Sequence, residues 1–362
     1  MRVFSHAAPG APAIDNEIPT PELTRAQVLL GVTHVGVCHS DLHGQEDSYD
    51  LGSAGRMRMR DIGAVYPIVL GHEIIGKVLA AGPEATVAPG ERRYIVYPWI
   101  GCGECAACRA GRENDCTGAR HNLSIQEKGG FAHEVVVPDE RYLIELGDLD
   151  PAWAATLPCA GLTTYAATSK VLPVDPDDPI AIIGAGGLGL MAIGVLRARG
   201  HRNMVSVDVS EAALQNAKAM GVAATVVATG SDAAKRLRRA GGGRPVAVLD
   251  FVNNRASSTL ALATLANGGT LVSVGLFGGD LGFSTSALAL RQLTIKGSFV
   301  GSLAELQELV DLARRTTLPK LPIHERPLAA DEVNRALAGL REGTVHGRTV
   351  LVAGEREKTN VP

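Results

Sequence analysis

The chain contains few aromatic residues, little net charge and few cysteines, and each scarcity argues against a class of protein. Aromatic residues make up 4% of the 362 residues, the formal net charge is −3, and there are six cysteines. So small a net charge creates no field that attracts nucleic acid or an anionic membrane, and we expect neither as a partner. Residues 1–12 lack the apolar stretch of a signal peptide, so we expect a cytoplasmic protein in which disulfides are rare.

Long uncharged segments are also scarce, and the one that could suggest a membrane span has a better explanation. Residues 179–196 carry no charge, but a cluster of glycines at 184–189 interrupts them. A strand, a tight turn and a helix explain this composition better than a membrane helix of about 20 apolar residues does.

Glycine is abundant, and the hydrophobic pattern changes once along the chain. The sequence holds 42 glycines, and its 46% hydrophobic and 20% charged residues are typical of soluble globular proteins. Residues 1–150 have the pattern of short β-strands separated by glycine and proline turns. From Ile180 onward apolar strands alternate with amphipathic helices, which indicates a doubly wound parallel sheet. We therefore predict an α/β protein with a β-rich domain and a doubly wound domain.

The domain bounds and the elements of the second domain follow from this change. The β-rich domain is expected over 1–153 together with the returning tail 318–362, and the nucleotide-binding domain over 154–317. Residues 152–171 are expected to form one helix. The predicted strands of the second domain are 180–184, 203–208, 223–228, 246–250, 270–275 and 292–297, and its further predicted helices are 187–199, 210–220, 231–240, 256–266 and 302–314.

Four of the six cysteines are closely spaced within residues 99–118, namely Cys102, Cys105, Cys108 and Cys116. Four thiolates can surround one tetrahedral zinc ion at roughly 2.3 Å per bond, which leaves no position for water. We therefore predict a structural zinc site in a small lobe. Incidental reduced thiols and an iron–sulfur cluster are the alternatives, because they use the same residues.

A glycine-rich turn links the first predicted strand of the second domain to a helix. Its G-x-G-x-x-G segment comprises Gly184, Gly186, Gly187, Leu188 and Gly189. Such a turn binds a dinucleotide pyrophosphate at the helix N-terminus. Asp208 ends the next predicted strand, where a carboxylate accepts hydrogen bonds from the ribose hydroxyls and repels a 2′-phosphate, so we expect NAD rather than NADP. A turn without a ligand, and Asp208 as a helix N-cap, are the alternatives.

Two cysteines lie outside the four-cysteine lobe, Cys38 and Cys159, and His72 lies between apolar strand segments. Two cysteines and one histidine form a donor set used by catalytic zinc, which polarises an alcohol or carbonyl oxygen and suits hydride transfer to a nicotinamide. Each of the three could also be an ordinary packed residue, and periodicity does not show that they converge.

Several motifs, taken in order, resemble the zinc-dependent alcohol dehydrogenases of the medium-chain dehydrogenase/reductase superfamily over nearly the whole chain. The motifs are Gly36–His43, Gly71–Glu73, Cys102–Cys116, Pro158–Tyr165, Gly184–Gly189, Asp208 and Gly347–Arg348. The resemblance implies a GroES-like β-rich catalytic domain and a Rossmann domain, with two zinc ions per chain and NAD. The implied activity is the interconversion of primary or secondary alcohols with aldehydes or ketones by hydride transfer.

The same resemblance implies roles for individual residues. Cys38, His72 and Cys159 would bind the catalytic zinc, with Glu73 beside it and Asp41 orienting the imidazole. Ser40 and His43 would relay the proton of the alcohol through the cofactor ribose. The implied NAD contacts are His39 and Arg348 at the pyrophosphate, Gly184, Gly186, Gly187, Leu188, Gly189 and Asp208 at the adenosine half, and Thr163, Val274, Gly275 and Leu276 at the nicotinamide. Trp99 resembles a wall of the substrate pocket, although it could equally be packing.

The segment between His43 and Gly71 is longer than the common spacing of the family. It holds Arg56, Arg58 and Arg60, which would suit either an entrance loop that selects substrates with a distant anionic group or an exposed loop or subunit contact. We expect a homodimer or homotetramer. A sorbitol-type polyol dehydrogenase is an alternative, but that branch usually has Glu at the third ligand, where this chain has Cys159. A non-catalytic nucleotide-binding relative is disfavoured because no zinc ligand is missing.

Overall fold

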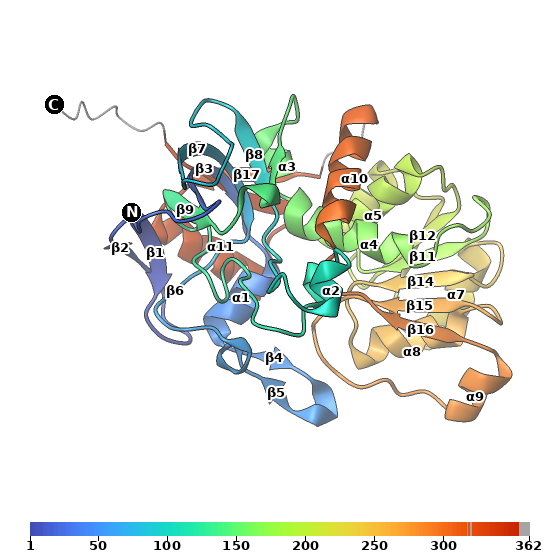
Figure 1. Ribbon diagram of the computed structural model, residues 1–362. Helices are drawn as coiled ribbons and strands as arrows, with labels where there is room; N and C mark the ends of the chain where they lie inside the picture. The colour runs from blue at the N-terminus through green and yellow to red at the C-terminus, as the bar shows by residue number, and fades with distance from the viewer. Residues whose placement is uncertain (317, 319–320, 355–362) are drawn as a thin grey trace. The chain divides into compact units, whose positions relative to one another are not determined.

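The computed structural model describes residues 1–316, 318 and 321–354, which form two compact units (Figure 1). Unit 1 consists of Met1–Asp47, Met59–Cys159 and the chain from Pro322, and unit 2 consists of Ser48–Arg58 and Ala160–Leu321. Residues 48–58, which the sequence prediction left in the first domain, thus group with unit 2. The predicted boundary at residue 317 and the predicted end of the tail at 355–362 lie outside the described residues.

Unit 1 is built on a seven-stranded sheet with the order β10–β8–β7–β3–β18–β17, in which β9 also pairs with β3. The central strand β3 pairs antiparallel with three neighbours, and its valines and leucines are buried at most positions, as expected for a strand covered on both faces. The strands are β3 (Val28–Gly36), β7 (Glu73–Ala81), β8 (Arg93–Val96), β9 (Glu134–Val137), β10 (Leu143–Glu145), β17 (Ile323–Pro327) and β18 (Arg348–Val352).

The remaining elements of unit 1 are a small sheet and short helices. The sheet has the order β2–β1–β6. Its strands are β1 (Arg2–His6), β2 (Ala13–Glu17) and β6 (Ile68–Val69), and the helices are α1 (His39–Glu46), α2 (Ala106–Arg109), α3 (Pro151–Ala154) and α11 (Ala330–Glu342). Short 3₁₀ turns cover Met59–Ile62, Glu113–Asp115 and Glu140–Tyr142. Because α1 begins directly after β3, the end of the central strand delivers Cys38 to the start of a helix.

Unit 2 contains a six-stranded parallel sheet with the order β13–β12–β11–β14–β15–β16. The strands are β11 (Ile180–Ile183), β12 (Met204–Asp208), β13 (Ala224–Val227), β14 (Ala247–Asp250), β15 (Thr270–Ser273) and β16 (Thr294–Gly297). The helices are α4 (Leu162–Ser169), α5 (Gly187–Ala198), α6 (Glu211–Ala219), α7 (Ala233–Ala240), α8 (Arg255–Thr264), α9 (Thr285–Leu290) and α10 (Leu303–Arg315). The predicted doubly wound parallel sheet and its listed elements are thereby confirmed, and only α9 was not predicted.

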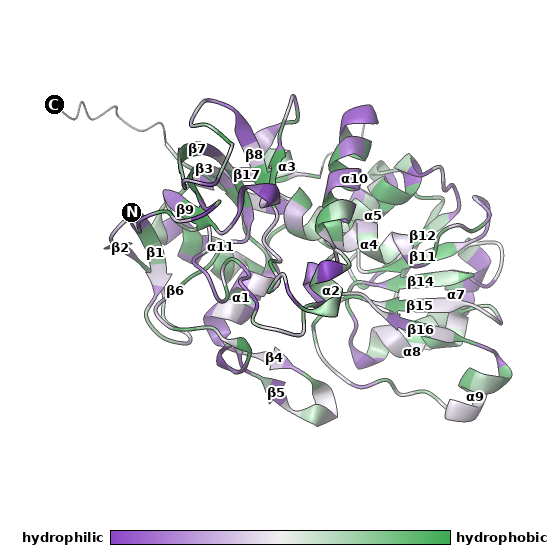
Figure 2. Ribbon diagram, viewed as in Figure 1, coloured by the Kyte–Doolittle hydropathy of each residue, from purple (hydrophilic) through white to green (hydrophobic). Residues whose placement is uncertain are grey.

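The order of this sheet places a crossover point between β11 and β14, where ligands of doubly wound sheets bind. Its core is apolar because the strands are buried on both faces, and Figure 2 shows hydrophobic residues along them. Valines and isoleucines from the strands pack there against leucines of α7 and α8, including Ile183, Val205, Val248, Leu237 and Leu262.

Two further segments differ from the sequence prediction. The region 152–171, expected as one helix, is divided into α3, a π-helical turn at Leu157–Gly161, and α4. The segment 48–58 forms the two-stranded hairpin of β4 (Tyr49–Asp50) and β5 (Arg56–Met57), with a 3₁₀ turn at Gly52–Ala54 between them. Within the described ranges, no helix is long and apolar enough to cross a membrane.

Candidate active site and metal centres

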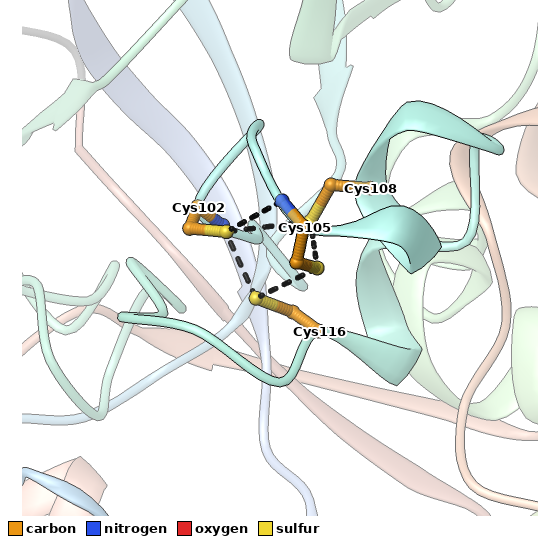
Figure 3. A group of neighbouring side chains, drawn as sticks. All are labelled: Cys102, Cys105, Cys108 and Cys116. Atoms are coloured by element: carbon orange, nitrogen blue, oxygen red, sulfur yellow. Dashed lines mark hydrogen bonds between the residues drawn. The ribbon is translucent and has the colours of Figure 1, made fainter.

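The four closely spaced cysteines converge on one point, and Figure 3 shows their side chains directed toward one another around α2. The sulfur of Cys105 lies 3.5 Å from that of Cys108 and 4.0 Å from that of Cys116, and the sulfurs of Cys102 and Cys108 are 4.0 Å apart. Four sulfurs on a tetrahedral zinc ion are separated by roughly 3.8 Å, given bonds of about 2.3 Å. The lobe therefore fits the predicted structural zinc.

Local contacts also prepare these thiols for metal binding. The backbone N–H groups of Cys102 and Gly118 point at the Cys116 sulfur, at 3.3 Å each. Hydrogen bonds from the backbone of Cys108 and Thr117 lower the pKa of Cys105 to about 5, which favours the thiolate that binds metal, whereas burial raises the pKa of Cys108 to about 12.

A second group of metal donors comprises Cys38, His72, Glu73 and Cys159, whose donor atoms all lie within 4.8 Å of one another. Three different elements supply them, because Cys38 follows β3, His72 and Glu73 stand at the start of β7, and Cys159 lies in the π-helical turn. The sulfurs of Cys38 and Cys159 are 3.7 Å apart, again close to the separation in a tetrahedral zinc site. The residues predicted as ligands of a catalytic zinc are thus brought together.

The orientation of His72 leaves one ring nitrogen available for a metal. Its Nδ1 lies 3.1 Å from Oδ1 of Asp41, while its buried Nε2 has no partner among the described residues. Burial alone would lower the pKa of His72, but the Asp41 carboxylate and the Cys38 sulfur together raise it. A buried imidazole close to two sulfurs, with one nitrogen held by a carboxylate, is what a zinc site of this donor set requires.

Glu73 and Arg348 form a buried ion pair beside these donors. Burial raises the pKa of Glu73 to about 7, although the Arg348 guanidinium opposes that shift. The other carboxylate oxygen, Oε1, is buried without a partner in the described part of the chain. The guanidinium of Arg348 is paired with Glu73 in the structure. Its predicted contact with a pyrophosphate stays a prediction.

The predicted proton-relay residues lie on α1. Ser40 and His43 are separated by three positions, so they share one face of the helix, and both are partly exposed. His39, at the first position of the same helix, is exposed. The helix is capped at its N-terminus by Cys38 and Asp41, and this capping box links α1 to a candidate metal donor, while the relay role of Ser40 and His43 stays a prediction.

Trp99 packs against the metal donors. Its indole Nε1 donates a hydrogen bond of 3.0 Å to the carbonyl of Pro158, and its ring centroid lies 5.2 Å from that of His72. The side chain is buried, so it supports both the π-helical turn that carries Cys159 and the imidazole. Its predicted role as a wall of the substrate pocket remains a prediction.

The glycine-rich turn has the close packing that a dinucleotide site needs. A Cβ on Gly189 would lie 1.8 Å from the carbonyl oxygen of Gly184, so only glycine allows α5 to begin against the end of β11. Asp208 accepts hydrogen bonds from the backbone N–H of Ala185 at 2.7 Å and of Ser210 at 2.8 Å. The carboxylate therefore fixes the glycine-rich turn itself, which the sequence did not reveal.

The residues predicted to face the nicotinamide are Thr163 in α4 and the segment Val274–Leu276 after β15. Asn253 holds this segment, because its Nδ2 donates to the carbonyl of Gly275 at 2.9 Å and its Oδ1 accepts from Ser273. Sequence reasoning missed Asn253. A pair of asparagines shortly after a buried strand, here β14, was the available signal.

Comparison with known families gives a match in each unit. Residues 24–148 match the family described as alcohol dehydrogenase GroES-like domain, and residues 187–315 match the family described as zinc-binding dehydrogenase.

Whole-chain comparisons extend these matches. An NAD-dependent alcohol dehydrogenase from Sulfurisphaera tokodaii is 35% identical over 97% of this chain and 100% of its own length. The solved alcohol dehydrogenase of Aeropyrum pernix superimposes with a TM-score of 0.86 at 29% identity, covering 97% of this chain and 100% of that one. The acetophenone reductase of Geotrichum candidum, solved in complex with NAD, gives a TM-score of 0.82 at 27% identity, covering 97% and 96% of the two chains.

Proposed function

Since the chain belongs to the zinc-dependent alcohol dehydrogenases of the medium-chain dehydrogenase/reductase superfamily, we propose that it oxidises alcohols at the site of Cys38, His72 and Cys159. It is an NAD-dependent oxidoreductase that interconverts primary or secondary alcohols with aldehydes or ketones, and its substrates are small molecules. The observation that carries the assignment of the site is the convergence of these donors, from three separate elements, within 4.8 Å.

The residues of this site hold and orient the metal donors. Cys38, Cys159 and the free Nε2 of His72 would bind zinc, which when present supplies a Lewis acid for the alcohol or carbonyl oxygen. Asp41 fixes the orientation of the His72 imidazole, since its carboxylate binds Nδ1 of that ring and accepts the backbone N–H groups of Cys38 and Gly71. Glu73 lies within reach of the same point, with its charge balanced by Arg348.

Residues outside the metal-donor group would transfer the alcohol proton and bind NAD. We assign to the Ser40 hydroxyl the acceptance of the alcohol proton, and to the His43 imidazole its delivery to solvent. We assign the pyrophosphate of NAD to the N-terminus of α5 and the adenosine ribose to Asp208, whose carboxylate lies at the glycine-rich turn. NAD when bound supplies the hydride acceptor.

The test is a spectrophotometric screen for NADH formation over primary, secondary, benzylic and polyol alcohols, combined with metal analysis. Active protein should contain about two zinc ions per chain, one in each donor group. Active protein with a single zinc ion would contradict the assignment. Activity confined to polyols would instead favour the sorbitol-type alternative.

We also propose a homodimer or homotetramer. The edge strand β16 pairs on one side only within the described sheet, and the segment that precedes it in the sequence exposes large apolar side chains, with Leu281 at 49% and Leu290 at 82%. Exposed apolar residues beside a strand edge favour association. Light scattering tests this proposal, and Leu290→Lys should shift the mass toward the monomer.

A cytoplasmic location and the domain bounds 1–153 with 318–362, and 154–317, remain proposals. Support for the location comes from the cysteines, because all six belong to the two metal-donor groups and none forms a disulfide. Limited proteolysis tests the bounds, and cleavage is expected first near the junctions of the two units.

A further inference from the structure

The hairpin of β4 and β5 belongs to unit 2, although the chain on either side of it belongs to unit 1 (Figure 1). At its base Asp47, the residue that ends α1, forms an ion pair with Arg60 at 2.7 Å. At its tip the 3₁₀ turn Gly52–Ala54 presents Ser53. The sequence left the purpose of this long segment open. Arg60, one of its three arginines, is paired with Asp47, and a role of the segment in attracting an anionic substrate stays a prediction.

Ser53 is bound to one residue of unit 2, Asp280. Its backbone N–H lies 3.1 Å from both carboxylate oxygens, and its hydroxyl donates to Oδ1 at 2.7 Å. These hydrogen bonds hold the pKa of Asp280 below its ordinary value, so the carboxylate is ionised at neutral pH. Hydrogen bonds to a charged acceptor are stronger than those between neutral groups.

The backbones of the two segments also touch directly. A Cβ on Gly52 would lie 2.8 Å from the carbonyl of Gly279, and a Cβ on Gly278 would lie 2.7 Å from the Cβ of Asp50. A side chain is therefore excluded at both Gly52 and Gly278. The close approach of the two backbones and the three hydrogen bonds together make a defined contact, in which the Ser53 and Asp280 side chains are themselves exposed.

The loop that Ser53 holds continues directly from the segment Val274–Leu276. Asn253 fixes the start of this segment through the carbonyl of Gly275. After Leu276, glycines at 278, 279 and 282 allow the backbone of the loop many conformations. A further contact is needed to hold the loop in a single conformation. Asp280 lies among these glycines, so its bond to Ser53 provides a second anchor.

We propose that Ser53 and Asp280 form a latch that holds Val274–Leu276 in position against the nicotinamide half of NAD. The proposal rests on the NAD-dependent function proposed above, and it makes Ser53 and Asp280 positioning residues that touch no reacting atom. The latch acts on the nicotinamide half alone, because the pyrophosphate and adenosine contacts come from β11, α5 and Asp208.

Two ligands separate these effects. NADH fills both halves of the cofactor site, whereas ADP-ribose lacks the nicotinamide. Fluorescence titration of Asp280→Ala should show an NADH Kd raised roughly five-fold, which corresponds to about 1 kcal/mol, while calorimetry shows the ADP-ribose Kd unchanged. The KM for NAD should rise in parallel, and the zinc content should stay that of the wild type.

Matched variants sharpen the test. Ser53→Ala removes one of the three hydrogen bonds and should have a smaller effect, and it should add nothing in the Asp280→Ala background. Ser53→Thr keeps the hydroxyl and should retain wild-type affinity. Asp177→Asn, which breaks an exposed ion pair with Arg202 elsewhere in unit 2, is the control and should change neither affinity.

The outcomes distinguish the latch from the proposed function. If the wild type binds NADH and Asp280→Ala binds it equally well, the latch is wrong and the function stands. Equal losses for NADH and ADP-ribose would also overturn the latch, because they indicate general disruption of unit 2. A wild type that neither binds NADH nor forms it from any alcohol overturns both proposals.

Discussion

Oδ1 of Asp41 lies 3.1 Å from Nδ1 of His72, and the same buried carboxylate accepts the backbone N–H groups of Cys38 and Gly71 at 2.9 Å each. Cys38 follows β3 and His72 precedes β7, so one side chain fixes two metal donors that lie far apart in the sequence. These three bonds use most of the acceptor positions of the carboxylate, which leaves little freedom for any replacement.

Asp41→Asn should therefore loosen the catalytic zinc. The amide would turn its NH₂ group toward one of the donors that the carboxylate now accepts, and it would lose the charge that orients the imidazole. We expect zinc affinity at this site to fall about 10- to 100-fold, with activity falling in parallel. Titration against a zinc-chelating dye measures the affinity. The exposed Asp15→Asn is the control, and equal zinc affinity in Asp41→Asn and the control would refute the orienting role.

Cys38→Ala should abolish alcohol oxidation while leaving NADH binding intact. The substitution removes one of three predicted ligands of the catalytic zinc, whereas the glycine-rich turn and Asp208 lie in unit 2. Metal content should fall from about two zinc ions per chain to about one. Retained turnover in Cys38→Ala would overturn the assignment of this residue as a ligand.

Cys105→Ser should have the complementary effect. It disrupts the four-cysteine lobe, whose fold depends on short turns around the sulfurs, so the melting temperature should drop by several degrees. About one zinc ion per chain should again be lost, and the remaining ion should keep the enzyme active at low temperature. A melting temperature equal to that of the wild type would show that the lobe does not need its metal.

The extent to which the sequence predicted the site depends on the distance between interacting residues. The four cysteines and the glycine-rich turn are local, so their spacing alone indicated a zinc lobe and a nucleotide site. Cys38, His72 and Cys159 meet only because β3, β7 and the π-helical turn meet, and no periodicity within the sequence encodes that meeting.

Other features were missed because they depend on contacts between distant segments. Ser53 in the hairpin contacts Asp280 more than 200 positions later. The arginines of this segment suggested a role in the sequence, whereas nothing around Ser53 indicated its contact. The division of 152–171 into two helices was missed because its apolar residues suit one continuous helix. The π-helical turn between them is held from outside by the Trp99 indole, which binds the carbonyl of Pro158.

Asp208→Ser should weaken the preference for NAD over NADP. The carboxylate would repel a 2′-phosphate, and serine would remove that charge while keeping a polar group near Ala185. We expect the ratio of kcat/KM for NADP to that for NAD to rise at least about tenfold, mainly through KM, since two like unit charges about 4 Å apart repel each other by more than about 1 kcal/mol. Steady-state kinetics with both cofactors measure the ratio. An unchanged ratio would mean that Asp208 serves only to brace the glycine-rich turn.

The stability of unit 1 should fall as the pH is lowered from about 6.5 to about 4 because of His34 in β3. Burial lowers the pKa of His34 to about 4, with Arg93 lowering it further and Asp150 opposing, while its Nδ1 lies 3.1 Å from the hydroxyl of Thr33. In this window the unfolded chain binds a proton that the folded chain does not, so acid favours unfolding.

His34→Gln should therefore flatten the pH dependence of the free energy of unfolding. The imidazole is partly exposed, so we expect it to account for about 2 kcal/mol between pH 6.5 and pH 4. Urea unfolding at a series of pH values measures the slope. Burial also lowers the pKa of His6, which belongs to unit 1 as well, so a smaller slope of the same sign should remain in the variant. A slope equal to that of the wild type would show that His34 takes up its proton equally in the folded and unfolded chains.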